Sequence, residues 1–70
     1  MLVKVAPIGE RVVEVNAETN STVGAILDIA GVVINGRTIS VNNNSADENT
    51  QVTTENSIIA LAGKMKGGHK

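Results

Sequence analysis

One segment of this sequence repeats its apolar residues with a helical period, and this limits the possible folds more than any other feature. The apolar positions recur at i, i+3, i+4 and i+7, at Val23, Ile26, Leu27 and Ala30. Ser21 is the expected N-cap, and Gly31 stands where a left-handed C-terminal residue is favoured. A single helix this short is marginal in water, so it must lay its apolar stripe across a sheet.

The other apolar segments have the patterns of strands. Alternation predicts strands over residues 1–6, 11–16, 38–41 and 57–62, and Val32-Val33-Ile34 is an unbroken apolar run typical of a buried strand. Pro7 to Glu10 predicts the turn of a hairpin between the first two strands. Asn35-Gly36 predicts a second tight turn. The order is therefore β-β-α-β-(β)-β.

The remaining segments are polar or rich in glycine. Residues 42–51 hold almost no apolar side chain, so we expect an exposed, mobile loop, with Val52 reaching the core at its end. Residues 1–62 form one domain, and residues 63–70 a flexible tail. Gly24, within the helix, is either tolerated or allows another backbone to approach closely. The expected core is Met1, Val3, Val5, Val13, Val15, Val23, Ile26, Leu27, Val33 or Ile34, Ile39, Ile59 and Leu61.

Composition excludes several classes of function. The chain has no cysteine and one histidine, so we expect no disulfide and no metal site, and no other cofactor is indicated. It has no aromatic residue and a net charge of −1, which argues against nucleic acid as a partner. No apolar run approaches the roughly 20 residues that cross a membrane, so we expect a cytoplasmic protein. No group of residues indicates an enzyme: Asp47, Glu48 and Glu55 read as solvated surface charges.

After its last predicted strand the chain continues with Lys64-Met65-Lys66-Gly67-Gly68, and this tail resembles that of ubiquitin and of the related sulfur carriers of thiamine and molybdopterin synthesis. Those proteins also begin with alternating apolar residues, as at Met1, Val3 and Val5. Their last strand is followed by a tail that ends in two glycines, which Lys64-Met65-Lys66-Gly67-Gly68 resembles. Two departures stand out: His69-Lys70 follow the glycine pair, and Gly63 stands where ubiquitin carries a large apolar residue.

The resemblance implies an α+β fold of the ubiquitin-like β-grasp kind, a mixed sheet with one helix across one face. It also implies a monomeric protein modifier or sulfur carrier, activated at Gly67-Gly68 by a partner adenylating enzyme. A processing protease would first remove His69-Lys70. Lys64, Met65 and Lys66 would dock the tail on the activating enzyme. About six extended residues separate Leu61 from the glycine pair, a reach of about 20 Å.

Other interpretations of the same residues stay open. The glycine pair is also an ordinary composition for a chain terminus, in which case the domain acts only as a protein-binding module. Its docking surface would be the sheet face away from the helix, where alternation places Leu2, Val12, Ile58 and Ala60. An alternative interpretation is that these four residues are ordinary apolar residues scattered over the surface, with no role in binding. The sequence does not choose between sulfur transfer and protein conjugation.

Overall fold

The structure is a computed structural model that describes residues 1–63. The tail residues Lys64, Met65 and Lys66 and the glycines Gly67 and Gly68 lie outside the described residues. In chain order the elements are β1 (Leu2–Pro7), β2 (Val13–Asn16), β3 (Ser21–Thr22), α1 (Val23–Ala30), β4 (Thr38–Val41), β5 (Asn44–Ala46), β6 (Gln51–Val52) and β7 (Ser57–Ala62).

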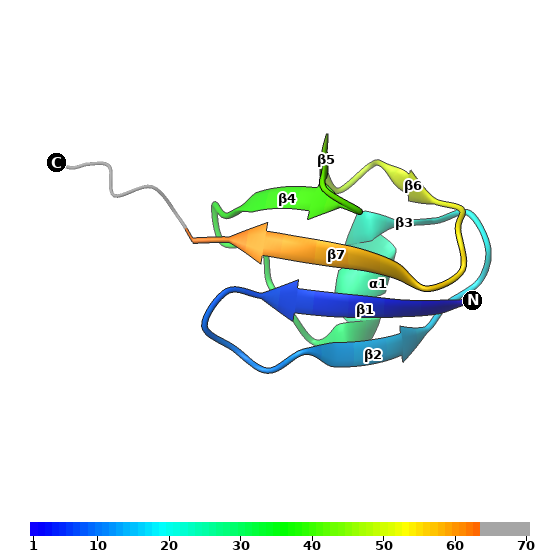
Figure 1. The fold of residues 1–70 in the computed structure, drawn as a ribbon, viewed down its shortest axis with the longest axis horizontal. Coiled ribbons are helices and arrows are strands. Elements are labelled where there is room, and N and C mark those ends of the chain that lie inside the picture. Colours follow the sequence, from blue (N-terminus) through cyan, green and yellow to red (C-terminus); the bar gives the residue numbers. More distant parts are fainter. Residues whose placement is uncertain (64–70) are drawn as a thin grey trace, which may run out of the picture.

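Five of the strands form one mixed sheet in the order β2-β1-β7-β4-β5. β1 and β7 run parallel at its centre, and the other neighbours are antiparallel. The remaining two strands, β3 and β6, form a small second sheet. Helix α1 crosses one face of the large sheet (Figure 1). The predicted α+β arrangement, a mixed sheet with one helix across one face, is confirmed.

The first two strands form the predicted hairpin. Val3 pairs with Val15 and Val5 with Val13, so the valines of both strands share the helix face. Gly9 in the connecting turn has a φ of 81°, a left-handed value that suits glycine. The predicted strand over residues 11–16 was too long, because residues 11 and 12 belong to the connection and β2 begins at Val13.

Helix α1 begins and ends at capped residues. The side chain of Thr22 accepts a hydrogen bond from the Ala25 amide at 3.2 Å, so Thr22 is the N-cap and the prediction of Ser21 was wrong by one residue. Ser21 instead lies in β3 and donates its hydroxyl to the Glu18 carbonyl. Gly31 ends the helix with a φ of 74°, as predicted.

The core lies between α1 and the sheet and contains nearly all of the residues expected there. Eleven apolar residues are buried: Val3, Val5, Val15, Ala17, Val23, Ile26, Leu27, Ile39, Val52, Ile59 and Leu61. Met1, Val13 and Ile34 are partly buried and pack against them. Of the two alternatives for the segment after the helix, Ile34 packs on the core, whereas Val33 is 68% exposed.

Val32-Val33-Ile34, predicted as a buried strand, has no regular secondary structure. The cap at Gly31 turns the chain, and the Val32 amide donates back to the Leu27 carbonyl at 3.0 Å. Arg37, rather than a neighbouring strand, satisfies the carbonyls of Val33 and Ile34: its side chain donates to both, and its backbone amide donates to that of Ile34 at 2.9 Å. An apolar run of three residues is compatible with both structures, and here Arg37 supplies the donors.

The polar segment 42–51, predicted as an exposed loop, contains a strand. Asn42 and Asn43 have φ values of 51° and 71°, and two consecutive left-handed residues make the tight turn that joins β4 to β5. The end of the segment approaches the helix, where the Gly24 amide donates to the Glu48 carbonyl at 2.9 Å. A Cβ on Gly24 would lie 3.2 Å from that oxygen, so this glycine does allow a close backbone approach.

Candidate functional site

The last described residues of the chain are held at the centre of the sheet. Ile59 and Leu61 of β7 are fully buried between the neighbouring strands and the helix. The Ile8 amide donates to the Leu61 carbonyl at 2.9 Å, and Ala62 pairs with Thr38 of β4. Gly63 follows directly and is exposed. The route to the glycine pair therefore starts from a rigid strand that has a partner on each side.

Two connections flank the exit of the chain from the sheet, at Ala62 and Gly63, and one side chain joins these connections. Arg37 donates to the Glu10 carboxylate at 3.1 Å, which links the β1–β2 turn to the segment before β4. It also donates to the carbonyls of Val33 at 2.7 Å and Ile34 at 3.3 Å. Only 13% of the Arg37 side chain is exposed, so most of it is packed against the protein. Sequence analysis missed this pair, because no local pattern relates residue 10 to residue 37.

The sheet face away from the helix carries the residues predicted as a binding patch, but with a charged pair among them. Alternation in β1 and β7 places Leu2, Ile58 and Ala60 on this face, and Ile58 is 47% exposed. Lys4 lies on the same face, directly between Ile58 of β7 and Glu14 of β2.

The fourth predicted member, Val12, precedes β2 and is 56% exposed. It lies in the connection rather than in a strand. The structure thus brings three of the four predicted residues onto one face, and it adds a lysine and a glutamate that the prediction did not include.

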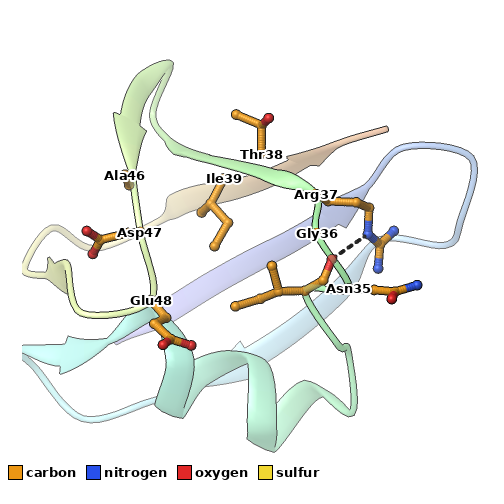
Figure 2. Close-up of a pocket in the computed structure, with 9 residues that line it drawn as sticks. Asn35, Gly36, Arg37, Thr38, Ile39, Ala46, Asp47 and Glu48 are labelled. Atoms are coloured by element: carbon orange, nitrogen blue, oxygen red, sulfur yellow. Dashed lines mark hydrogen bonds between the residues drawn. The ribbon is translucent and has the colours of Figure 1, made fainter. Parts of the chain in front are cut away.

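A groove opens beside the exit, on the β4–β5 side of the sheet. Its volume is about 460 Å³, and it is lined by Ile34, Asn35, Gly36, Arg37, Thr38, Ile39, Ala46, Asp47 and Glu48. Figure 2 shows the Ile39 side chain directed into this space and Glu48 on the opposite wall, whereas the Asp47 carboxylate points away from Ile39. The groove therefore combines an apolar surface with a wall that carries two acidic residues, Asp47 and Glu48. Sequence analysis did not identify it, since its walls come from two segments that meet only in the fold.

Within residues 1–63, no three His, Cys, Asp or Glu side chains are grouped so that they could hold a metal ion. In the same residues, no helix has the length and apolar character needed to cross a membrane.

The comparisons with known proteins bear on the fold. No protein-family model matches the chain, and no curated protein matches it. Among solved structures, the crystal structure of H. volcanii small archaeal modifier protein 1 matches with a TM-score of 0.73. The match covers 91% of this chain and 98% of that chain, at 16% sequence identity. At this identity the likeness shows the fold, and it confirms the predicted ubiquitin-like β-grasp.

Proposed function

We propose that this protein is a ubiquitin-like modifier or sulfur carrier, activated at Gly68 by a partner adenylating enzyme after His69-Lys70 are removed. The observation that carries the proposal is the connection between the fold and the tail. The central strand of a β-grasp sheet leads through Gly63 into Lys64-Met65-Lys66-Gly67-Gly68. The structural neighbour is named a modifier protein, which supports the same kind of function here.

The chemistry needs a terminal carboxylate that can enter a narrow site. The Gly68 carboxylate attacks the α-phosphorus of ATP, which forms an acyl-adenylate and releases pyrophosphate. A thiol, an amine or sulfide then attacks the carbonyl carbon and displaces AMP. Two residues without Cβ let the backbone thread and bend where side chains would clash. Six residues from Ala62 to Gly67 span about 20 Å when extended, enough to reach a buried nucleotide.

This mechanism requires the folded domain to hold the start of the tail in a fixed position. Because β7 is paired on both sides and its inward side chains are buried, the start of the tail is fixed relative to any docked partner. The Glu10–Arg37 ion pair holds together the two connections beside it. The protein supplies a handle and a docking surface, while the catalytic groups belong to the adenylating enzyme. We propose that the protein acts in the cytoplasm as a monomer.

The test compares versions of the chain with the cognate adenylating enzyme and ATP. ATP–pyrophosphate exchange should appear with a chain ending at Gly68 and be absent with the full chain. Gly68→Ala in the shortened chain should suppress it. Gly63→Ala is the matched control, because a Cβ there meets nothing within 4 Å and the exchange should persist. Exchange with the full chain, or equal exchange with Gly68→Ala, would refute activation at this residue.

A second candidate function is a binding module that is not conjugated and acts by docking alone. The exposure of Ile58 on the open sheet face favours it. Ile58→Lys should then weaken binding to a protein partner at least tenfold. Ile29→Lys provides the control, because Ile29 is 64% exposed but lies on the helix. Equal loss with both variants would argue against a docking surface on the sheet.

A further inference from the structure

The charges of this chain are divided unevenly between the body and the tail. All seven Asp and Glu residues lie in residues 1–63, whereas three of the six Lys and Arg residues lie in residues 64–70. Two of these carboxylates, Asp47 and Glu48, stand on one wall of the groove beside the exit (Figure 2). The body therefore presents an acidic, partly apolar groove next to the start of a basic segment.

The opposite wall of the groove does not offset this acidity. The guanidinium of Arg37 faces the Glu10 carboxylate and two backbone carbonyls, so its charge is already compensated. The Asp47 carboxylate accepts hydrogen bonds from the Asn49 amide at 2.9 Å and the Thr50 hydroxyl at 3.2 Å, both neutral donors. Within residues 1–63, no ion pair involves Asp47 or Glu48. A cation is the complement that these two carboxylates favour.

The apolar part of the groove has a defined position relative to the exit. Ile39 and Ala46 are a cross-strand pair of β4 and β5, and Thr38 at the near end of the groove pairs with Ala62. Neighbouring strands lie about 4.8 Å apart, so β5 is about 10 Å from β7. Three extended residues cover about 10 Å, and the third residue after Ala62 is Met65.

We propose that Lys64-Met65-Lys66, the basic segment, docks in this groove of its own chain, with Met65 over Ile39 and Ala46. Gly63 allows the chain to turn across the start of β4, because glycine lacks the Cβ that restricts other residues. The flanking lysines then lie on the side of the groove that carries Asp47 and Glu48. The flexible, unbranched side chain of methionine suits an irregular apolar surface.

The docking itself does not depend on the proposed function. Its effect on activation, however, rests on the proposed function. A docked basic segment withholds the glycine pair from an adenylating enzyme. The enzyme must offer Lys64 and Lys66 better acidic partners than the groove does before the tail can extend. The groove thereby makes activation conditional on recognition of the tail, which is an autoinhibitory contact.

The methionines provide the measurement, because the chain has only two of them. With ¹³C-methyl methionine labelling of the full chain, the Met65 methyl should show nuclear Overhauser effects to the methyls of Ile39 and Ala46 at low salt. These effects should weaken at about 1 M salt, where screening is effective beyond about 3 Å. The Met1 methyl, which packs against the core, reports in every sample that the body is folded.

Two variants separate this contact from a general attraction between body and tail. Glu48→Lys should abolish the nuclear Overhauser effects of Met65. The substitution does not otherwise disturb the groove, because the Glu48 carboxylate makes no side-chain hydrogen bond within residues 1–63. Asp28→Lys makes the same change of charge on an exposed helical residue outside the groove and should leave the effects intact. Equal loss in both variants would overturn the proposal.

Two further outcomes would also contradict it. Absence of Met65 effects while those of Met1 persist would show that the groove is empty of the tail. Effects that appear only between differently labelled chains in a mixed sample would show that a second copy occupies the groove. Neither result would bear on activation at Gly68, because no enzyme or ATP is present in these samples.

Discussion

Ile26 and Ile29 allow a matched test of the helix packing, because they lie in one helix and differ in burial. Ile26 is fully buried, whereas Ile29 is 64% exposed. Truncating a buried isoleucine to alanine costs about 2–5 kcal/mol, less a few tenths of a kcal/mol gained in helix propensity. A domain of this size rarely has more than about 3–5 kcal/mol of stability. Ile26→Ala should therefore leave at most about 3 kcal/mol, and Ile29→Ala should stay within about 0.5 kcal/mol of the natural protein.

Urea unfolding followed by far-ultraviolet circular dichroism is the suitable assay, because the chain has no aromatic residue to report by fluorescence. For a small domain the slope is about 1 kcal/mol per molar urea, so Ile26→Ala should lower the midpoint by about 2 M or more. The midpoint of Ile29→Ala should move by less than about 0.5 M. If both variants shifted the midpoint equally, the assigned inward face of α1 would be wrong.

Three further substitutions test particular contacts by the same unfolding assay. Gly24→Ala should not bring the roughly 1 kcal/mol gain of an open helix, since the new Cβ would lie 3.2 Å from the Glu48 carbonyl; a full gain would contradict the close approach. Arg37→Ala should cost about 1–3 kcal/mol and Glu10→Ala less than about 1 kcal/mol, because only the arginine side chain also donates to the carbonyls of Val33 and Ile34, of which Ile34 keeps the backbone amide of residue 37; equal costs would argue against this difference. Asn42→Ala should cost about 1–3 kcal/mol, since it removes two hydrogen bonds to β7 and places alanine at a φ of 51°. An unchanged midpoint would show that the Asn42 side chain does not stabilise the contact between this turn and β7.

Most of the fold follows from local periodicity. β7 was predicted with its observed bounds, since Ser57 to Ala62 alternates between the core and the open face. The helix was also recognised, because its apolar stripe has a period that no strand shares. The error at Val32-Val33-Ile34 has a physical cause: a short apolar run does not reveal whether a strand or a side chain will satisfy its carbonyls. That choice depends on Arg37, which lies outside the run.

The asparagines in residues 42–51 indicate a tight turn, although the polar composition of this segment suggested a loop. All five residues other than glycine that have positive φ in residues 1–63 are asparagines: Asn20, Asn35, Asn42, Asn43 and Asn56. Asparagine tolerates the left-handed region better than most residues, so the Asn42-Asn43 pair was a signal for a tight hairpin. A polar composition was instead taken to exclude a strand.

The candidate site was predictable only in part. The open-face residues Leu2, Ile58 and Ala60 follow from alternation within their strands. The Glu10–Arg37 pair joins residues 27 positions apart, and the groove joins residues 34–39 to residues 46–48; no local pattern in either case indicates that these residues meet. Lys4 also alternates onto the open face, but its position between Glu14 and Ile58 depends on the register of three strands.

The C-terminal residue of the protein recovered from its native cells is the most direct measure of the proposed function. Mass spectrometry should find chains that end at Gly68, as a free carboxylate, a thiocarboxylate or an amide with a lysine of another protein. Trypsin cleaves after Lys66, so conjugation would leave Gly67-Gly68 attached to the acceptor lysine. Recovery of chains that all end at Lys70, with no Gly-Gly remnant on any lysine, would contradict activation at Gly68.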